Sequence, residues 1–423
     1  MTDSLPVFPK SSGSNISAKG RASGGSANAT LRQESHATGP GGRLNVLVTD
    51  GNYKHTLGIV RSLGQKGIKV TVLANSQSDL SSYSRYCYRT EIAPKPAETG
   101  FVDAVVNILR RGFYDLLIPV GYLATESLAH RQREIRALTR LEIADYAQIK
   151  AAADKKHVCE LAFRLGLPVP RTIYPDTWND VQRAQELLQY PIAIKPLLES
   201  SKATVRYAQS EDKLLSIYRE VCEEGGFNDG DLPMLQEYIP GHGCGFFALY
   251  QQGACKRIFM HRRIRENPPS GGASTCAESF YDERLKKYGI YLLDHLHWHG
   301  VAMAEYRYDT RVDDYKLLEV NPKFWGSLDL ALAAKAEFPY DLCQMAKGVR
   351  LDYTEEYDRN LRYHWPLSGE IHHLVRRPSA LASVLGDCIN PRVKSNMWAA
   401  DPRPNLAEAL AMVRTGFRRV LTG

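Results

Sequence analysis

Residues 301–327 read V-A-M-A-E-Y-R-Y-D-T-R-V-D-D-Y-K-L-L-E-V-N-P-K-F-W-G-S. Two strand-like runs flank the polar turn at 309–314, so the stretch is predicted to be a β-hairpin. If the register is symmetric about this turn, Glu305 lies opposite Glu319. Because side chains alternate across a strand, Asn321 shares the face of Glu319 and Arg307 shares the face of Glu305.

This hairpin carries the strongest candidate site of the chain. Directly opposed carboxylates destabilise a strand pair by roughly 0.2–1 kcal/mol, so the pattern needs a reason. Glu305, Glu319 and Asn321 present hard oxygen ligands, which suit Mg²⁺ or Mn²⁺ shared with a phosphate chain. The alternative is a solvated face whose carboxylates pair with Arg307 and Lys323. At this point both readings stay open.

Length and composition define the broad class of the protein. The chain has 423 residues, enough for about two or three domains. Its 43% hydrophobic, 24% charged and 9% aromatic residues are an ordinary globular balance, which excludes a fibrous or wholly disordered protein. No stretch approaches the ~20 apolar residues of a membrane span, and the N-terminus lacks the pattern of a secretory signal.

Cysteine spacing and net charge further restrict the classes of protein to which the chain can belong. The eight cysteines are scattered with no C-x-x-C pair, so neither a disulfide framework nor a zinc ribbon is indicated. We therefore expect a cytoplasmic protein with reduced thiols and no membrane partner. The net charge of +7 is spread over short basic groups, so a nucleic-acid partner is not expected. An anionic small ligand such as a nucleotide phosphate is the alternative use of these charges.

Outward from the hairpin, the chain divides into five segments. Residues 1–42 are rich in Ser, Gly and Ala and are predicted to be a disordered tail. Residues 43–145 alternate strand-like and helix-like runs, which predicts an α/β domain with a parallel sheet. Its first turn, D-G-N-Y-K at 50–54, is not a G-x-G-x-x-G fingerprint, so this sheet binds a substrate or merely supports its neighbour.

The other three segments follow a different pattern. Residues 146–245 open with a helix from 148 to 164 that carries D-K-K, followed by short strands. Together with 246–348 they are predicted to form α+β units with antiparallel strands. Residues 349–423 are predicted to be a mostly helical appendage of unknown role.

Two lysines are candidate phosphate contacts. Lys195 sits in an apolar strand immediately before Pro196, where an unpaired buried ammonium would be costly. A phosphate or, alternatively, a carboxylate would satisfy it. Lys155 on the preceding helix is a second candidate, although helix-surface lysines are mostly solvated.

A third feature is the stretch 261–275, H-R-R-I-R-E-N-P-P-S-G-G-A-S-T. Consecutive small residues allow backbone N–H groups to surround an anion, and the arginines would complement its charge. The same composition is also typical of a flexible loop.

The order of these elements resembles the ATP-grasp superfamily, in particular its carboxylate–amine ligase and carbamoyl-phosphate-synthase-like branch. The resemblance covers about residues 44–348. It rests on an α/β domain followed by D-K (154–155), I-A-I-K-P (192–196), L-Q-E-Y-I-P-G (235–241), P-S-G-G-A-S (269–274), E-Y-R (305–307) and L-L-E-V-N-P-K-F-W-G-S (317–327).

The resemblance implies a fold: an α/β and α+β protein with an N-terminal Rossmann-like, parallel-sheet pre-ATP-grasp domain at 43–145. Two α+β subdomains would clasp ATP, a central lid at 146–245 and a metal-binding subdomain at 246–348. It also implies roles at the matching positions. Contacts to ATP would come from Lys155, Lys195, Gln236, Glu237, Tyr238, Ile239, His242, Ser270, Gly271 and Gly272.

Metal and substrate roles are implied in the same way. Magnesium or manganese would be held by Glu305, Glu319 and Asn321. Arg263, Arg307 and Lys323 would face the transferred phosphoryl group and the carboxylate. Lys323 stands where arginine is frequent in related N-P-R motifs, so a point charge replaces a bidentate fork.

The function that follows is an ATP- and Mg²⁺-dependent ligase. It would activate a small-molecule carboxylate as an acyl phosphate and join it to an amine. A phosphotransferase and a non-catalytic nucleotide-binding regulatory module are the alternatives. A homodimer is the default expectation for the oligomeric state.

Overall fold

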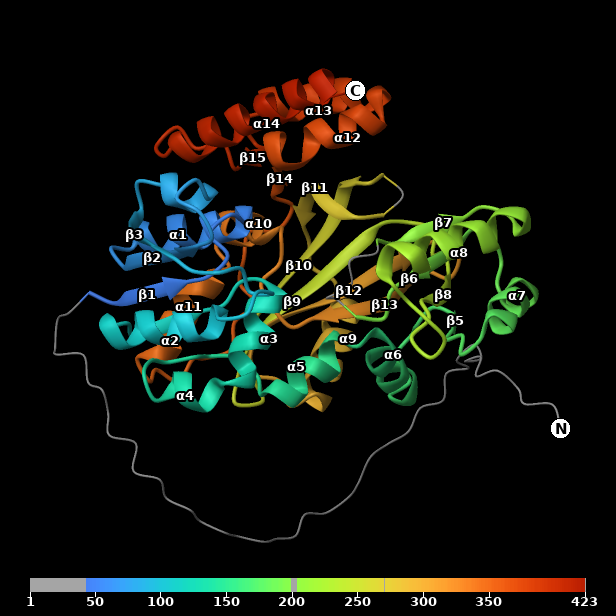
Figure 1. Cartoon of the computed structure of the whole chain (residues 1–423), viewed down its shortest axis with the longest axis horizontal. Coiled ribbons are helices and arrows are strands. Elements are labelled where there is room, and N and C mark those ends of the chain that lie inside the picture. The colour runs from blue at the N-terminus through green and yellow to red at the C-terminus, as the bar shows by residue number, and fades with distance from the viewer. Residues whose placement is uncertain (1–42, 199–203, 270, 423) are drawn as a thin grey trace, which may run out of the picture.

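The computed structural model describes residues 43–198, 204–269 and 271–422, with side chains described as far as Val413. The predicted tail at 1–42 and the predicted contact Ser270 lie outside the described residues. Within these ranges the chain forms three sheets with helices around them (Figure 1). No helix in this part of the chain is long and apolar enough to cross a membrane.

The first sheet is parallel and has the strand order β3-β2-β1-β4, which confirms the predicted N-terminal fold class. Val46 and Val48 pack in one core with α1, whereas Leu47 faces the core that contains α2, so both faces of the sheet are covered. The elements are β1 (Asn45–Val48), α1 (Lys54–Gln65), β2 (Lys69–Ala74), β3 (Cys87–Ile92), α2 (Phe101–Arg111), β4 (Leu116–Ile118), α3 (Tyr122–His130) and α4 (Gln132–Arg136).

A break divides the helix that the sequence predicts from 148 to 164. The structure has two helices, α5 (Tyr146–Ala153) and α6 (Lys155–Arg164). Asp154 between them is extended, and its carboxylate accepts a hydrogen bond from the backbone N–H of His157 at 3.1 Å. The aspartate therefore caps α6 rather than continuing one helix, and Lys155 becomes its first residue.

The second sheet is small, antiparallel and ordered β5-β8-β6-β7. Two helices cover it, and Ile192 and Ile194 of its central strand pack with Tyr218 in a core of their own. Its elements are β5 (Thr172–Ile173), α7 (Trp178–Leu187), β6 (Ile192–Lys195), β7 (Arg206–Ala208), α8 (Glu211–Gly225) and β8 (Met234–Glu237).

The third sheet has seven strands in the order β13-β12-β9-β10-β11-β14-β15. Its β12–β13 hairpin has the predicted register, with Glu305 opposite Glu319 and a bulge just beyond them. Its elements are β9 (Gly243–Gln251), β10 (Ala254–Asn267), β11 (Ala273–Ser279), α9 (Glu283–His295), β12 (Gly300–Asp309), β13 (Asp314–Asn321), α10 (Leu328–Ala333) and α11 (Phe338–Ala346).

The C-terminal segment is tied into this sheet. Its strand β14 (Arg362–His364) pairs with β11, and β15 (Lys394–Ser395) pairs with β14, so the prediction of a mostly helical appendage missed two strands. The helices α12 (Ile371–Arg376), α13 (Leu381–Ile389) and α14 (Arg403–Thr422) form a layer at one end of the molecule (Figure 1). The limits of the five segments stay a prediction.

Candidate active site

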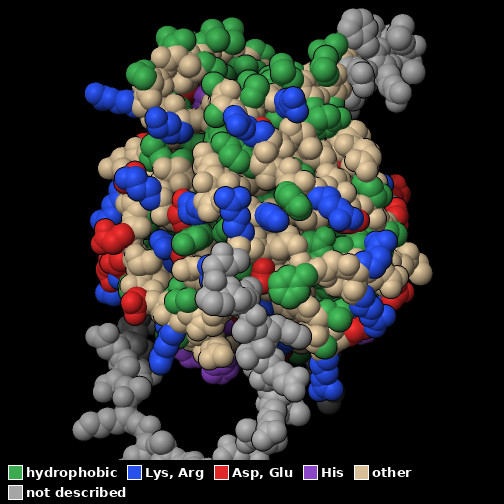
Figure 2. Space-filling view, turned by 90° about the vertical axis from the view of Figure 1, so that its left-hand side faces the viewer, with side chains coloured by type: hydrophobic (Ala, Val, Ile, Leu, Met, Phe, Trp, Pro, Cys, Tyr) green, Lys and Arg blue, Asp and Glu red, His purple; other side chains and the backbone are tan. Residues whose placement is uncertain are grey.

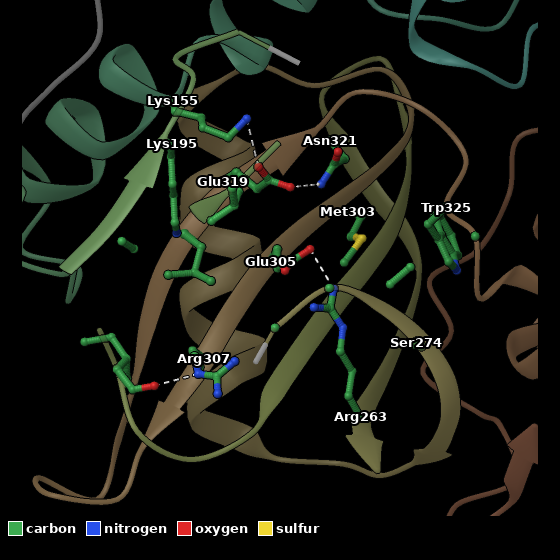
Figure 3. A pocket seen from close by; sticks show the side chains of 18 of the residues that line it. Lys155, Lys195, Arg263, Ser274, Met303, Glu305, Arg307, Glu319, Asn321 and Trp325 are labelled. Carbon is green, nitrogen blue, oxygen red and sulfur yellow. Dashed lines mark hydrogen bonds and ion pairs between the residues drawn. The ribbon is translucent and has the colours of Figure 1, made fainter. Parts of the chain in front are cut away.

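A cavity of about 360 Å³ lies where the small sheet faces the large one. Strands β6 and β8 contribute one wall, and β12 and β13 contribute the other (Figure 3). Its volume is in the range of small-molecule and cofactor sites. All of the predicted site residues line it except Ser270, which is not described, and His242.

The opposed carboxylates at the centre of the cavity are each paired with a cation. Glu319 Oε2 lies 3.0 Å from Lys155 Nζ, and Glu319 Oε1 accepts a hydrogen bond from the amide nitrogen of Asn321 at 2.9 Å. Glu305 Oε2 lies 2.7 Å from Arg263 Nη2 (Figure 3). The solvated-face alternative is therefore wrong for Arg307, because Arg263 and not Arg307 pairs with Glu305.

The two carboxylates differ in their tendency to ionise. Burial opposes ionisation of Glu319, but Lys155, Asn321 and Lys195 outweigh it and lower its pKa to about 2. Burial also raises the pKa of Glu305, which Arg263 offsets only in part, and the nearby charge of Glu319 raises it further. Ionisation of Glu305 therefore costs free energy here. A cation bound between the two carboxylates would offset that cost.

These donors fit a magnesium ion. Two carboxylates and an amide oxygen are the hard ligands that Mg²⁺ prefers, and no further acid completes a protein cage. Within the described ranges, no group of three or more His, Cys, Asp or Glu side chains is placed to hold a metal. Magnesium in nucleotide sites is typically held by one or two carboxylates together with substrate phosphates.

Lys195 is almost completely buried at the edge of the cavity, with 9% of its surface exposed. Its ammonium group donates a hydrogen bond of 2.6 Å to Gln236 Oε1, and Gln236 in turn donates to Thr172 Oγ1 at 2.9 Å. Burial lowers the pKa of Lys195, while the charges of Glu319 and Glu305 oppose that effect. The amide of Gln236 thus orients the ammonium group of Lys195.

Arg307 is hydrogen-bonded to the segment that joins the two sheets. Its Nε donates to the carbonyl oxygen of Ile239 at 2.6 Å, and its Nη2 donates to that of Gly241 at 2.8 Å. The guanidinium group lies 5.2 Å from the centre of the Tyr238 ring. Arg307 lines the cavity, and these contacts fix the course of the chain after β8.

The turn after β8 explains why His242 does not line the cavity. Gly241 has φ +108°, and a β-carbon there would lie 2.1 Å from the carbonyl oxygen of Tyr308. Only glycine fits such a close approach at this dihedral angle. The ring of His242 stacks on that of Tyr308, with centroids 5.3 Å apart.

The glycine-rich loop reaches the cavity through its second and third small residues. Gly271 and Gly272 both line it. Gly271 has φ +138°, and a β-carbon at Gly272 would lie 2.4 Å from the carbonyl oxygen of Asn267. The tight packing of this turn requires glycine at both positions.

Several residues of the cavity wall were not predicted from the sequence as site residues. Met303 could have been found, because it lies two residues before Glu305 on the same strand and so shares its face. Lys54 comes from the first turn of the parallel sheet, where no motif marks it. The missed residues include Lys54, Tyr207, Ser274, Met303 and Trp325.

Lys54 connects the cavity to the C-terminal segment. Its Nζ lies 4.4 Å from the centre of the Trp365 ring. Burial lowers the pKa of Lys54 to about 8, against the opposing charges of Asp329 and Glu408. The N-terminal domain thus reaches the wall of the site through Lys54, and the C-terminal segment contacts that lysine through Trp365.

Comparisons with known proteins agree with this geometry. No family model matches the chain. A D-aspartate ligase of Enterococcus faecium is 20% identical over 64% of this chain and 69% of that protein. The N-terminal section of the carbamoyl phosphate synthase large chain of Methanopyrus kandleri is 19% identical over 70% of this chain, which spans 53% of that protein.

Three solved structures share the fold. The biotin carboxylase of Campylobacter jejuni, solved as a β,γ-ATP complex, has a TM-score of 0.62 at 16% identity, covering 75% of this chain and 74% of that one. An L-amino acid ligase of Bacillus licheniformis has a TM-score of 0.56 at 17% identity, covering 73% and 75%. The biotin carboxylase domain of the Hydrogenobacter thermophilus 2-oxoglutarate carboxylase, solved with MgADP and bicarbonate, has a TM-score of 0.58 at 14% identity, covering 75% and 73%.

The predicted ATP-grasp fold and the predicted resemblance are thereby confirmed. The proteins that the chain resembles include two ligases, the D-aspartate ligase and the L-amino acid ligase.

Proposed function

We propose that this protein is an ATP-dependent ligase that activates the carboxylate of an amino acid or a related small molecule as an acyl phosphate and joins it to an amine. The single observation that carries the proposal is the half-buried pair Glu305 and Glu319, directly opposed in the wall of the cavity and each paired with a cation. A fold gains nothing from opposing two half-buried carboxylates, so the arrangement is explained by a ligand that uses both.

The nucleotide would lie between the two sheets. Lys195 and Lys155 would contact its phosphates, and the backbone of Tyr238 and Ile239 would meet the adenine. The hydrogen bond from Lys195 to Gln236 supports this role, because an ammonium group held in one direction needs no reorganisation when the phosphate arrives. Gly271 and Gly272 would bring backbone N–H groups close to the phosphate chain.

Glu305, Glu319 and Asn321 would hold magnesium. The ion would neutralise phosphate charge, which is what this chemistry needs from a metal. An ion at Glu319 would compensate its charge in place of Lys155, and the Lys155 ammonium group would then contact the phosphates.

The reaction needs no side-chain nucleophile. A carboxylate oxygen of the substrate attacks the γ-phosphorus of ATP, and the bond to ADP breaks. The amine then attacks the acyl carbon, releasing inorganic phosphate and leaving its proton to solvent. Arg263 and Lys323 line the cavity and would bind the substrate carboxylate and the transferred phosphoryl group.

The experiment is ADP release with Mg²⁺ across a panel of amino acids and small carboxylates, with hydroxylamine present to trap an acyl phosphate. The Glu319→Ala protein is the blank. Glu337→Ala is the matched control, because that carboxylate pairs with Lys66 at the surface, 2.9 Å away.

Each outcome has one meaning. A hydroxamate that requires both ATP and Glu319 supports the proposal and identifies the carboxylate. ADP formed without hydroxamate indicates a phosphotransferase. ATP binding with no turnover of any substrate indicates a nucleotide-binding regulatory module.

We further propose a cytoplasmic location and a homodimer. The location is supported by the eight cysteines, all of which are unpaired in the structure. Light scattering of the purified chain decides the oligomeric state.

A further inference from the structure

The C-terminal helices expose an unusual amount of apolar surface. Three side chains of α13 and three of α14 are spaced as successive turns of one helix face. Together with one residue of α12 they are between 52% and 83% exposed: Val375, Leu381, Leu385, Ile389, Leu406, Leu410 and Val413. Figure 2 shows hydrophobic side chains gathered at this end of the molecule. These seven residues are called the apolar face below.

The helices that carry the apolar face are firmly attached on their other side. Val384 and Asp387 of α13 are buried, and Asp387 accepts a hydrogen bond from Arg265 of β10 at 2.5 Å. Asp401, just before α14, lies 2.9 Å from Arg61 of α1, and both side chains are almost fully buried. The apolar face is therefore the outer side of a docked layer, and its exposure is not explained by a helix that has come away from the core.

The charges around the apolar face have one sign. Between residues 371 and 413 the basic side chains are Arg376, Arg377, Arg392, Lys394 and Arg403, and all five are exposed. The acidic side chains there are Asp387, Asp401 and Glu408. The first two are buried in the ion pairs described above, and Glu408 is half-buried. Aliphatic residues flanked in sequence by exposed cations, without an exposed acid between residues 371 and 413, can attract anions and also remove hydrocarbon from water.

We propose that the apolar face and its five basic residues bind the surface of an anionic lipid bilayer. Amphipathic helices with aliphatic residues on one side and Lys or Arg beside them lie in the interface between headgroups and acyl chains. Clusters of four to eight basic residues next to such a helix are typical of anionic-lipid recognition. A helix that lies on the bilayer surface does not cross it, so this proposal revises the expectation of no membrane partner.

Other occupants fit the observations less well. In a two-fold dimer the same patch lies on both subunits, so the five basic residues of one copy would face those of the other. Residues 1–42 of the same chain contain few large apolar side chains to cover seven exposed ones. The core of a protein partner's interface is typically rich in aromatic residues, whereas the apolar face is aliphatic throughout.

The test is flotation of the full chain with vesicles of phosphatidylcholine, with and without about 30% phosphatidylglycerol. Two double variants remove one half of the surface each: Leu385→Ser with Ile389→Ser, and Arg392→Glu with Lys394→Glu. Matched controls change exposed residues elsewhere: Phe113→Ser, and Lys95→Glu with Lys213→Glu. Thermal melting and ATP-dependent turnover check that every variant is folded.

We expect the full chain to float with anionic vesicles and not with neutral ones. The charge-reversal variant should bind at least about 30-fold more weakly, because each lost basic residue contributes about fivefold and the two added carboxylates repel the anionic lipid. The serine variant should bind about tenfold more weakly, and the controls should match the wild type.

Three results would overturn the proposal. The chain could stay unbound with both kinds of vesicle. It could float equally in all variants, which would place binding elsewhere. It could instead form a dimer, or a complex with an acidic protein, that depends on Ile389 without any flotation.

Discussion

Two sets of ion pairs in the described part of the molecule behave differently. Around the cavity, Glu305 and Glu319 oppose each other and depend on Arg263 and Lys155 for compensation. At the junction of the N-terminal domain with the C-terminal segment, Arg61 pairs with Asp401 in a site almost closed to solvent, with side chains 3% and 1% exposed.

The two sets differ in how completely their charged groups are hydrogen-bonded. Arg61 donates to Asp401 Oδ2 at 2.9 Å, to the carbonyl oxygens of Asn396 and Asp401 at 3.0 and 2.9 Å, and to Asn405 at 3.2 Å. Asp401 also accepts from Ser84 Oγ at 2.7 Å. The cavity pairs instead border open space and keep a repulsive contact. A buried ion pair therefore marks a functional site only where a cavity and an uncompensated charge accompany it.

The same chemical change should have opposite effects in the two sets. At the cavity, Glu305→Gln keeps the shape of the side chain and removes a charge whose pKa burial has raised. We expect ATP-dependent turnover to fall by about 10³-fold or more, because a metal ligand is lost. The free energy of unfolding should stay the same or increase, because Arg263 keeps Glu266 at 3.2 Å and the repulsion with Glu319 is gone.

Steady-state kinetics and urea unfolding of the same preparation measure both quantities. Retained turnover would remove Glu305 from the metal site. A large loss of stability would mean that the cavity pairs support the fold in the way that the Arg61 pair does.

At the domain junction, Asp401→Asn should lower the free energy of unfolding by about 3–5 kcal/mol, because it leaves the buried Arg61 without its charged partner. Turnover per folded molecule should stay near that of the wild type, since this pair does not line the cavity. Urea unfolding and active-site titration measure the two effects, and Glu337→Gln at the surface should change stability by less than about 1 kcal/mol. Loss of turnover with unchanged stability would reverse the comparison.

The opposed carboxylates of the cavity could be predicted from the sequence, whereas their cationic partners and the Arg61–Asp401 pair could not. The β12–β13 hairpin is local, so its turn and its alternation predicted the register that brings Glu305 opposite Glu319. Lys195 stood out as a charge inside an apolar strand. These signals arise within short stretches, where geometry follows from residue order.

Contacts between distant segments left no such signal. Strand β3 is a half-exposed edge strand with the sequence C-Y-R-T-E-I, too polar to be recognised. Strands β14 and β15 are three and two residues long and exist only through pairing with β11 and with each other. Arg61 meets Asp401 across 340 positions of sequence, and Asp154 ended a helix that periodicity alone would continue.

Lys54 lies between the two sets, since it borders the cavity and also contacts Trp365 of the C-terminal segment. Burial lowers its pKa to about 8, below the 10.5 of an ordinary lysine. Between these two pH values the unfolded chain binds more protons than the folded one, so the lysine's contribution to stability rises with pH. The stability difference between the wild type and Lys54→Met should therefore increase from pH 8 to pH 10.5, by about 1–3 kcal/mol once solvent in the cavity is allowed for.

Urea unfolding of both proteins at several alkaline pH values measures this difference, and the subtraction cancels the titration of all other groups. A titration of ¹³C-methylated lysines by NMR, with Lys54→Met assigning the signal, reports the ammonium group directly. A flat stability difference, or a Lys54 signal that titrates above 10, would show that water reaches Lys54 as freely as it reaches a surface lysine. Lys54 would then belong with the open cavity and its carboxylates, and the C-terminal segment would contribute packing through Trp365 without closing off the charge.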